Sequence, residues 1–371
     1  MSALEAELLA LCGRGVDAPL PDVEFNRLAL AVFAYQWERN APYGAYCRAR
    51  GASPETVSSW REIPALPTAA FKEAELTTEP GAVRVVYQTS GSTRGETKRG
   101  RHPLPDTRLY DASLEPNFQA HLLPDRDRIR ILVCGPSAEQ FPHSSLGHMH
   151  SRAIERFGAP GSGIYWNAEG PRFRELAAAL EAAEAEGEAV CLLGTAFGFV
   201  HFLDWLAEQR RTFRLPPGSR LMDTGGYKGR SREVPREELY ALYGERLGVP
   251  LTHVVNEYGM TELGSQFYDT VLRDLCAGTP GPADVAHRRK LPPPWVRVEV
   301  VYPETLCPVA DEEVGLLRFY DLANLHSVLA VQTDDLGQRR GAGFEILGRA
   351  AGAEPRGCSL AAEEFMSAQD R

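Results

Sequence analysis

The chain has 371 residues, of which 43% are hydrophobic and 24% charged, a composition typical of a globular protein with two or three structural units. Its formal net charge of −10 argues against bulk binding of nucleic acid, which requires a basic face. No apolar run approaches the roughly 18–20 residues that a membrane span needs, and the acidic N-terminus lacks the pattern of a signal peptide. We therefore expect a cytoplasmic protein that neither binds nucleic acid nor spans a membrane.

The seven cysteines do not indicate a disulfide framework or a zinc site, because their number is odd and no C-x-x-C pair occurs. Cys134 and Cys191 lie in apolar, strand-like runs and are expected in the core. Cys358 differs from them, since it lies near the C-terminus and away from any apolar run.

The N-terminal part of the chain predicts helices. Residues 23–38 carry apolar side chains at helical spacing, and the sequence Asn-Ala-Pro-Tyr-Gly at 40–44 ends that pattern. We expect residues 1–80 to form a helical region that packs on the core of the protein.

From residue 81 to 291 strand and helix patterns alternate, which predicts an α/β core with a largely parallel sheet. In such sheets ligands bind beyond the carboxyl ends of the strands. Loops at 89–98, 225–228 and 256–262 each follow a predicted strand, so we expect all three at that edge. The predicted strands are 130–134, 190–193 and 251–255, residues 221–226 are predicted to form a strand that runs into a turn, and the predicted helices are 171–186 and 235–247.

After three prolines at 292–294 the pattern changes to consecutive strands, predicted at 295–302, 315–320, 328–332 and 343–347. We expect a small β-rich subdomain over residues 292–349. Residues 350–371 are expected to form a C-terminal tail that carries Cys358.

The loop at 89–98 consists of small hydroxyl and glycine residues and ends in Lys98. Glycine allows close approach of the backbone and Ser and Thr add donors, so such a loop can bind a polyphosphate. Most such loops are plain turns, and the spacing of a P-loop is absent. Lys98 nevertheless favours a phosphate site, because lysine is rare in this chain, which has four lysines and thirty-six arginines.

A second motif at 256–262 reads Asn-Glu-Tyr-Gly-Met-Thr-Glu and places a tyrosine, a hydroxyl and an acid around a glycine turn. Alone, Tyr258 would be interpreted as a core residue and Glu262 as a surface charge. Together, the two motifs indicate ATP chemistry with a magnesium ion.

These motifs, in this order, resemble those of the adenylate-forming superfamily, which includes acyl-CoA ligases, luciferases and adenylation domains. Residues 89–98 resemble its phosphate loop and 258–262 its Tyr-Gly-x-Thr-Glu motif. Residues 332–337 are similar to its ribose motif, and Gly348-Arg349 to its hinge. The resemblance implies an adenylate-forming N-terminal-domain fold, of α/β class with a small β subdomain, and ATP and Mg²⁺ as cofactors.

Within the superfamily, the chain most resembles the acyl-protein synthetases of bacterial bioluminescence operons. The residues that carry this resemblance are 224–228 (Thr-Gly-Gly-Tyr-Lys) and 356–360 (Arg-Gly-Cys-Ser-Leu). It implies that a fatty acid is activated as acyl-AMP and then loaded onto a cysteine, here Cys358. A partner protein, a reductase or a carrier protein, would receive the acyl group.

The resemblance also implies roles in binding ATP. Tyr258 would stack on adenine, Asp335 would accept hydrogen bonds from the ribose, and Glu262 would hold Mg²⁺. Lys98 would act as a point charge on the phosphates, and Lys228 could partly replace a missing catalytic lysine. The other residues expected to bind ATP are Thr89, Ser90, Gly91, Ser92, Thr93, Gly95, Gly225, Gly226, Asn256, Gly259, Thr261 and Arg349.

For the acid and the acyl acceptor the sequence leaves alternatives open. His143 or His148 would steer the carboxylate or deprotonate the thiol, and a structural role is the alternative for each. Phe197, Phe199 and Met260 are candidates for the walls of an acyl tunnel, and Tyr227 is a further candidate for contacts with the acid. Core packing is the alternative for the two phenylalanines. Cys358 would react as the thiolate, with Arg349 and Arg356 nearby, or would be a tail cysteine without a role.

Several departures from the superfamily pattern are visible. The phosphate loop is one residue longer, because of Arg94, and Asp334 stands where glycine is usual. Ala350 and Ala351 stand where the hinge acid is usual. The usual C-terminal lid domain, with its catalytic lysine, is expected to be absent.

Two other functions remain open from the sequence. The chain could pass acyl-AMP to CoA, to a carrier-protein thiol or to an amine without modifying itself. It could also be a non-catalytic relative that binds nucleotide or serves as a scaffold for a reductase.

Overall fold

The computed structural model of the chain describes residues 1–89, 99–225, 234–279 and 288–350. The chain divides into two compact units, neither of which is continuous in sequence. Unit 1 contains Met1–Pro116, Met260–Gln266 and Leu291–Arg371, and unit 2 contains Asn117–Gly259 and Phe267–Lys290. The division falls inside helix α5 (Arg108–Leu122) and strand β12 (Lys290–Leu291).

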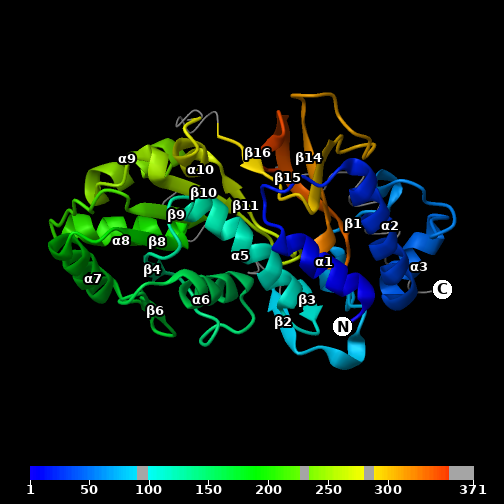
Figure 1. The fold of residues 1–371 in the computed structure, drawn as a ribbon, viewed down its shortest axis with the longest axis horizontal. Coiled ribbons are helices and arrows are strands. Elements are labelled where there is room, and N and C mark those ends of the chain that lie inside the picture. Colours follow the sequence, from blue (N-terminus) through cyan, green and yellow to red (C-terminus); the bar gives the residue numbers. More distant parts are fainter. Residues whose placement is uncertain (90–98, 226–233, 280–287, 351–371) are drawn as a thin grey trace. The chain divides into compact units, whose positions relative to one another are not determined.

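Unit 2 is the α/β part of the chain, drawn mainly in green and yellow in Figure 1. Strands β5, β4, β8, β9 and β10 form a parallel sheet in that order, and β11 pairs antiparallel with β10. The strands of this sheet are β4 (Arg130–Cys134), β5 (Gly163–Ile164), β8 (Val190–Thr195), β9 (Arg220–Thr224), β10 (Val254–Tyr258) and β11 (Phe267–Asp269). A small hairpin joins β6 (Trp166–Asn167) and β7 (Gly170–Pro171). The helices are α6 (Ser145–Phe157), α7 (Phe173–Glu186), α8 (Ala196–Glu208), α9 (Arg236–Leu247) and α10 (Val271–Cys276), with the 3-10 turn η3 (Leu251–His253).

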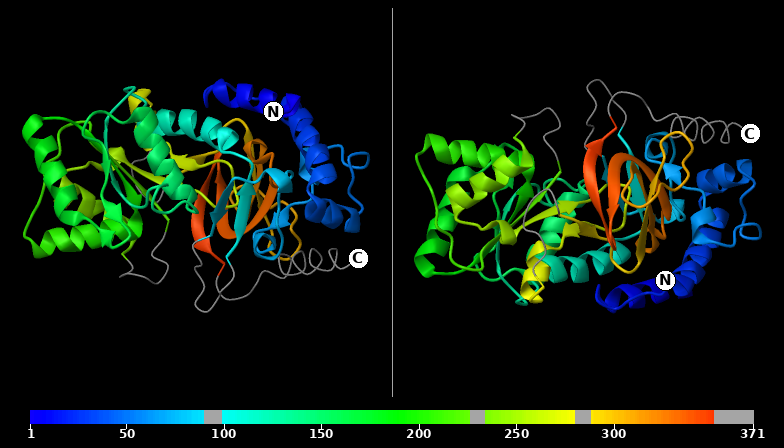
Figure 2. Two further views of the ribbon diagram at one scale, coloured as in Figure 1. Left: turned by 90° about the horizontal axis from the view of Figure 1, so that it is seen from below. Right: turned by 90° about the horizontal axis from the view of Figure 1, so that it is seen from above.

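Both faces of this sheet are covered, because all residues from Val190 to Leu193 have no exposed surface. On one face alternate strand residues such as Leu132, Leu192 and Leu221 share a hydrophobic cluster with α7, α8 and α9. In Figure 2 the green helices of unit 2 flank its strands. Near-continuous apolar strands are typical of a parallel sheet buried on both faces, and the predicted α/β class is confirmed.

Unit 1 combines the N-terminal helices with an antiparallel sheet. Strands β13 (Val296–Val301), β14 (Val314–Asp321), β15 (Ala330–Arg340) and β16 (Gly343–Arg349) pair in sequence order, and β1 (Leu66–Pro67) pairs parallel with β15. A separate hairpin contains β2 (Val85–Gln88) and β3 (Arg101–Leu104). The helices are α1 (Ala3–Gly13), α2 (Asp22–Arg39), α3 (Ala41–Ala49) and α4 (Ala70–Glu73), with the 3-10 turns η1 (Trp60–Glu62), η2 (Pro80–Ala82) and η5 (Leu322–Asn324).

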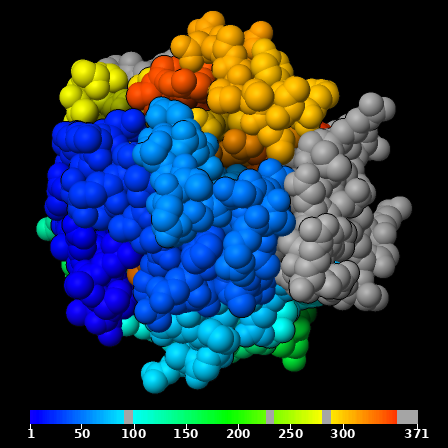
Figure 3. Space-filling model, turned by 90° about the vertical axis from the view of Figure 1, so that its right-hand side faces the viewer, coloured from blue at the N-terminus to red at the C-terminus, as the bar shows by residue number. Residues whose placement is uncertain are grey.

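The N-terminal helices are fixed to this unit by buried amides as well as by apolar packing. Gln36 of α2 donates to the carbonyl of Asn324, and Asn40 donates to the carbonyl of Ser327. Asn40 also caps α3, because its side chain accepts from the amide of Tyr43. Figure 3 views unit 1 from the side that these helices form, shown in blue. None of the helices in the described parts of the chain is both long and apolar enough to cross a membrane.

Several predicted elements are close to the observed ones, and two differ in a way that matters for the site. The predicted strand 328–332 is wrong at its C-terminal end, because β15 continues through Asp335 to Arg340. The predicted strand 251–255 is wrong at its start, since a 3-10 turn precedes β10, which begins at Val254.

A buried arginine in unit 2 makes a pH-dependent contribution to stability. Arg220 has no exposed side-chain surface, and its two terminal nitrogens lie 2.6 and 3.0 Å from the two carboxylate oxygens of Asp125. Burial alone would raise the pKa of Asp125, but hydrogen bonds from Arg220 and Arg126 outweigh it and hold that pKa well below its usual range.

We expect Asp125→Asn to lower the free energy of unfolding by about 2 kcal/mol at pH 7, because it leaves the buried guanidinium without its counter-charge. A carboxyl group with a depressed pKa stabilises the fold above its unfolded-state pKa of about 3.9 and loses that contribution as the pH falls further. Denaturant unfolding at pH 7 and at pH 3 should therefore show a difference between wild type and variant that shrinks in acid. Asp127→Asn, a change at an exposed aspartate, is the control and should match wild type at both pH values.

Candidate functional site

Many of the predicted site residues lie outside the described residues. These are Ser90, Gly91, Ser92, Thr93, Gly95 and Lys98 of the first loop, Gly226, Tyr227 and Lys228 of the second, and Cys358 of the tail. Their expected roles stay predictions. The described candidates fall into two groups, one in each unit.

The loop at 89–98 connects the two strands of the hairpin in unit 1. Thr89 and Gly100 close the loop at its base, because the amide of Thr89 donates to the carbonyl of Gly100 and the amide of Gly100 donates to Thr89 Oγ1, both at 2.9 Å. The expectation that this loop follows a strand of the parallel sheet is wrong, since β2 pairs antiparallel with β3. The return strand has only four residues and contains Pro103, so it gives little strand signal in the sequence.

The other two loops lie at the ends of parallel strands of unit 2, but the predicted loop 256–262 starts too early, because β10 continues through Tyr258. Strand β9 ends at Thr224, and Gly225 follows with a φ of 71°, a conformation that favours glycine. Strand β10 ends at Tyr258, whose ring lies 6.1 Å from that of Phe267, and Gly259 follows. Asn256 and the two glycines are thus placed at the carboxyl edge of one sheet.

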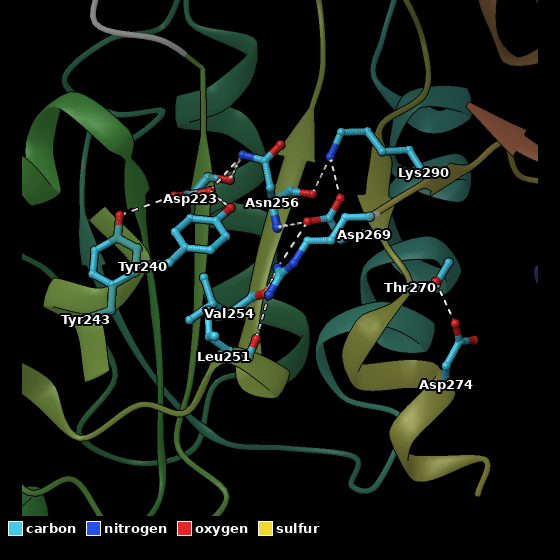
Figure 4. Close-up of polar contacts among 11 residues, drawn as sticks. Asp223, Tyr240, Tyr243, Leu251, Val254, Asn256, Asp269, Thr270, Asp274 and Lys290 are labelled. Carbon is cyan, nitrogen blue, oxygen red and sulfur yellow. Dashed lines mark hydrogen bonds and ion pairs between the residues drawn. The ribbon is translucent and has the colours of Figure 1, made fainter. Parts of the chain in front are cut away.

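Behind these loops a buried ionic cluster fixes strand β10 (Figure 4). Lys290 donates to the carbonyl of Asn256 at 2.8 Å and to Asp269 at 3.0 Å. Arg288 donates to the carbonyls of Val254 and Leu251. Two backbone carbonyls of β10 are thereby bound by buried cations, both of which contact Asp269.

A second carboxylate holds the side chain of Asn256. Asn256 Nδ2 donates to Asp223 Oδ1 at 2.7 Å, and the hydroxyls of Tyr240 and Tyr243 donate to the same carboxyl group. Burial raises the pKa of Asp223, and it would also raise that of Asp269, but Lys290 and Arg288 reverse the effect and lower it. The amide nitrogen of Asn256 is therefore bound within the protein, which favours a positioning role for this group over direct contact with a ligand.

The described candidates for binding the acid, apart from Met260 of unit 1, lie around α6 and α8 of unit 2. His143 is exposed in the loop before α6, and His148 is half-buried on that helix. Phe197 is half-buried at the start of α8, where its ring lies 4.5 Å from that of His201. Phe199 is a core residue, because it has no exposed surface and belongs to the hydrophobic cluster under α8.

In unit 1 the acidic residue of the second motif is buried. Glu262 is 6% exposed, so the alternative of a surface charge is wrong. Burial raises the pKa of Glu262 to about 7, and Asp335 adds to this, while Arg349 and Lys72 act in the opposite direction. Met260 and Thr261, which precede Glu262, are half-buried, and Thr261 Oγ1 donates to the carbonyl of Gln88 at the end of β2.

The ribose and hinge candidates lie next to each other in the same unit. Asp335 and Arg349 are paired across strands β15 and β16, and Arg349 Nε lies 3.2 Å from Asp335 Oδ1. The side chain of Asp335 is 12% exposed and that of Arg349 is 64% exposed. Asp334 is exposed, so Asp335 is the inward-facing member of the Asp-Asp pair. The choice of Asp335 over Asp334 as the ribose residue stays a prediction.

The residues present fit a magnesium ion that is held mainly by substrate. The described residues contain no group of three or more His, Cys, Asp or Glu side chains that could hold a metal by themselves. Mg²⁺ commonly binds through one or two carboxylates together with substrate phosphates. A buried carboxyl whose pKa is raised to about 7 is also one whose charged form a bound cation would stabilise.

Sequence reasoning missed the side chains that hold the backbone around Glu262. His102 of β3 contacts the carbonyl of Thr261, and Asn324 of η5 donates to the carbonyl of Glu262. Asp321 accepts hydrogen bonds from the amide of Gly264 and the hydroxyl of Ser265. The motifs give no signal for these residues, because each lies more than 50 positions away in the sequence.

The fold is that of the adenylate-forming enzymes. An open conformation of 2-hydroxyisobutyryl-CoA ligase, solved in complex with 2-HIB-AMP and CoA, is similar with a TM-score of 0.63, over 91% of this chain and 76% of that chain, at 14% identity. Within this class, the model of the family "Acyl-protein synthetase, LuxE" matches residues 21–367, and the chain belongs to that family. It is accordingly a ligase, and both levels of the resemblance seen in the sequence are confirmed.

Two relatives span most of the chain. The long-chain-fatty-acid–luciferin-component ligase of Vibrio harveyi is 22% identical over 93% of this chain and 89% of its own length. The enzyme of the same name from Aliivibrio fischeri is 24% identical over 90% of this chain and 86% of its own length.

In the ionic cluster of unit 2, removing one charge should destabilise the fold more than removing two opposite charges together. We expect Asp269→Asn to lower the free energy of unfolding by about 3–5 kcal/mol, because it leaves Lys290 and Arg288 buried without a counter-charge. Removing the charge from both sides, in Asp269→Asn with Lys290→Met, should recover part of that loss. Urea unfolding of the two variants measures this, and a double variant less stable than Asp269→Asn would contradict the pairing.

Proposed function

We propose that the chain activates a carboxylic acid as acyl-AMP with release of pyrophosphate. The names of its two relatives support a long-chain fatty acid as this substrate. The acyl group is then transferred to a thiol, that of Cys358, and delivered to a partner protein such as an acyl reductase or a carrier protein. ATP is the second substrate and Mg²⁺ the cofactor.

The observation that carries this proposal is the setting of Glu262. Its buried carboxyl lies in the field of Asp335, Arg349 and Lys72, which come from three other parts of the chain. Perturbed carboxyl groups gather at functional sites, and this one belongs to the motif that predicted magnesium and ATP. A bound Mg²⁺ would neutralise phosphate charge, and Glu262 is the residue that would hold it.

In the first step a carboxylate oxygen of the acid attacks the α-phosphorus of ATP. A carboxylate-oxygen–phosphorus bond forms, the bond between the α-phosphorus and the bridging oxygen breaks, and pyrophosphate leaves. Two anions have to meet, so the task of the protein is to align them and neutralise charge. Lys98 and the hydroxyls of the 89–98 loop would contact the phosphates, and Asp335 would bind the ribose with Arg349 holding its carboxylate.

The remaining ATP contacts are assigned to unit 2. Tyr258 would stack on adenine, and Gly225 and Gly226 would let that base approach the backbone. Asn256 would act indirectly, through the position of β10, since its amide is bound to Asp223. Lys228 would add positive charge near the reacting carboxylate.

In the second step the Cys358 thiolate attacks the acyl carbonyl carbon. A carbon–sulfur bond forms, the bond to the phosphate oxygen breaks, and AMP leaves with that oxygen. His143 or His148 would take the thiol proton or steer the carboxylate in the first step. Phe197, Tyr227 and Met260 would contact the acyl chain.

The proposal predicts acid-dependent exchange of pyrophosphate into ATP, which should be measured across fatty acids of graded length. In Glu262→Gln, exchange at limiting Mg²⁺ should fall by about 100-fold, because a metal contact that contributes about 3 kcal/mol is lost. The amide resembles the neutral carboxyl, so the variant should fold.

Glu257→Gln is the matched control, because Glu257 is also a buried carboxyl whose pKa burial raises to about 7. This variant should keep the wild-type requirement for Mg²⁺. An unchanged Mg²⁺ requirement in Glu262→Gln would contradict the metal-binding role of Glu262. If the wild-type protein binds ATP but shows no exchange with any acid, a non-catalytic function would be favoured instead.

A separate prediction concerns the thiol. Cys358→Ser should retain ATP–pyrophosphate exchange but lose the hydroxylamine-labile acyl-enzyme that forms with radiolabelled acid and ATP, because a hydroxyl is a much poorer nucleophile than a thiolate. Cys307→Ser, which alters an exposed cysteine of unit 1, should still become labelled. Undiminished labelling of Cys358→Ser would refute the assignment. Transfer of the acyl group to added CoA with release of AMP, and without any acyl-enzyme, would indicate a small-molecule or carrier acceptor.

A further inference from the structure

Two consecutive backbone carbonyls at Glu262 are each held by a buried side chain of unit 1. His102 Nδ1 lies 2.6 Å from the carbonyl oxygen of Thr261, and Asn324 Nδ2 donates to the carbonyl oxygen of Glu262 at 2.9 Å. Both side chains belong to residues that are 1% exposed. The peptide groups on both sides of the Glu262 α-carbon are therefore fixed from β3 and from η5.

The direction of these hydrogen bonds follows from the partners. Asn324 Nδ2 also donates to the carbonyl of Val328 at 2.8 Å, so both of its hydrogens are used and the amide cannot be turned around. The carbonyl of Thr261 can only accept, so the proton of a neutral His102 ring lies on Nδ1. In the neutral ring His102 Nε2 and Asn324 Oδ1 are then both acceptors, and neither accepts a hydrogen bond from the described residues. Only a protonated His102 could donate directly to Asn324, and burial opposes that form by lowering the pKa of His102 to about 4.

These two acceptors belong to residues that line one small cavity of about 10 Å³. That volume corresponds to about one water molecule, and a site needs two or more polar partners to retain a water. An acceptor pair cannot bond directly, whereas a molecule with two hydrogens can bond to both. His326, whose Nε2 lies 3.6 Å from Glu5 Oε1, lines the same cavity.

We propose that one buried water molecule occupies this cavity and donates to His102 Nε2 and to Asn324 Oδ1, and that His102 is thereby a positioning residue for Glu262. The hydrogen bonds then form a closed ring from the carbonyl of Thr261 through His102, the water and Asn324 to the carbonyl of Glu262. This inference rests on the proposed role of Glu262 in adenylation. His102 lies two residues after Gly100, so the ring also joins the return strand of the 89–98 hairpin to the Glu262 backbone.

The ring makes a spectroscopic prediction that does not depend on activity. In protein labelled with ¹⁵N-histidine, His102 should show the tautomer with the proton on Nδ1, and exchange spectroscopy should detect a long-lived water near Nε2. The His102 signals are assigned by their loss in His102→Asn. A proton on Nε2, or no bound water near it, would overturn the proposal.

Two substitutions separate positioning from packing. Asparagine places an amide nitrogen where His102 has Nδ1, whereas phenylalanine fills the space of the ring without any donor. We expect His102→Phe to raise the Mg²⁺ concentration for half-maximal ATP–pyrophosphate exchange by about five- to tenfold, the equivalent of one hydrogen bond, and His102→Asn to raise it by less than about twofold.

His121→Phe is the control, because His121 is another buried histidine whose Nδ1 contacts a helix carbonyl, that of Asn117, in unit 2. It should leave the Mg²⁺ requirement unchanged. Equal effects of His102→Phe and His102→Asn would contradict the positioning role. If the wild type shows no exchange at all, the proposed function fails, and the tautomer and the bound water still decide whether the ring exists.

Discussion

The segment Met260–Gln266 is an irregular piece of backbone that is buried from Glu262 onward, and side chains of unit 1 bind several of its polar groups. Buried N–H and C=O groups that belong to no helix or strand must find partners among side chains or water. Asp321 binds one end of the segment, through Gly264 and Ser265. His102 and Asn324 bind the other end, around Glu262. A carboxyl that is costly to ionise is thus held by a backbone that has little freedom to move.

Both units fix backbone carbonyls near the candidate site, but with side chains of different charge. In unit 2 the carbonyls of β10 are bound by Arg288 and Lys290, which are buried cations compensated by Asp269. Such pairs give little net stability but penalise any arrangement that separates them. In unit 1 the partners around Thr261 and Glu262 are neutral. Because these partners carry no charge, the charged groups that shift the pKa of Glu262 are Asp335, Arg349 and Lys72. A charged ligand bound there would shift it further.

Much of the fold and the family could be predicted from the sequence, because the informative patterns are local. Apolar runs predicted β4 and β8, and the order of the motifs indicated the adenylate-forming class. The hairpin around the 89–98 loop was not predicted, since Pro103 interrupts a strand of only four residues. His102 and Asn324 were also missed, because nothing near them in the sequence shows that they contact Thr261 and Glu262. Such long-range pairings depend on the complete topology and cannot be read from spacing.

The pairing of Asp335 with Arg349 also sets where the C-terminal segment starts. The amide of Ala350 donates to the carbonyl of Asp334, so the segment leaves the sheet beside the candidate ribose acid. Cys358 lies nine residues beyond Arg349, and a chain of that length extends at most about 30 Å. The covalent chain therefore keeps the Cys358 thiol within that distance of Arg349, which corresponds to a local concentration in the millimolar range whatever the amount of protein in the cell. If Cys358 accepts the acyl group as proposed, the transfer occurs within one molecule, so its rate does not depend on the protein concentration.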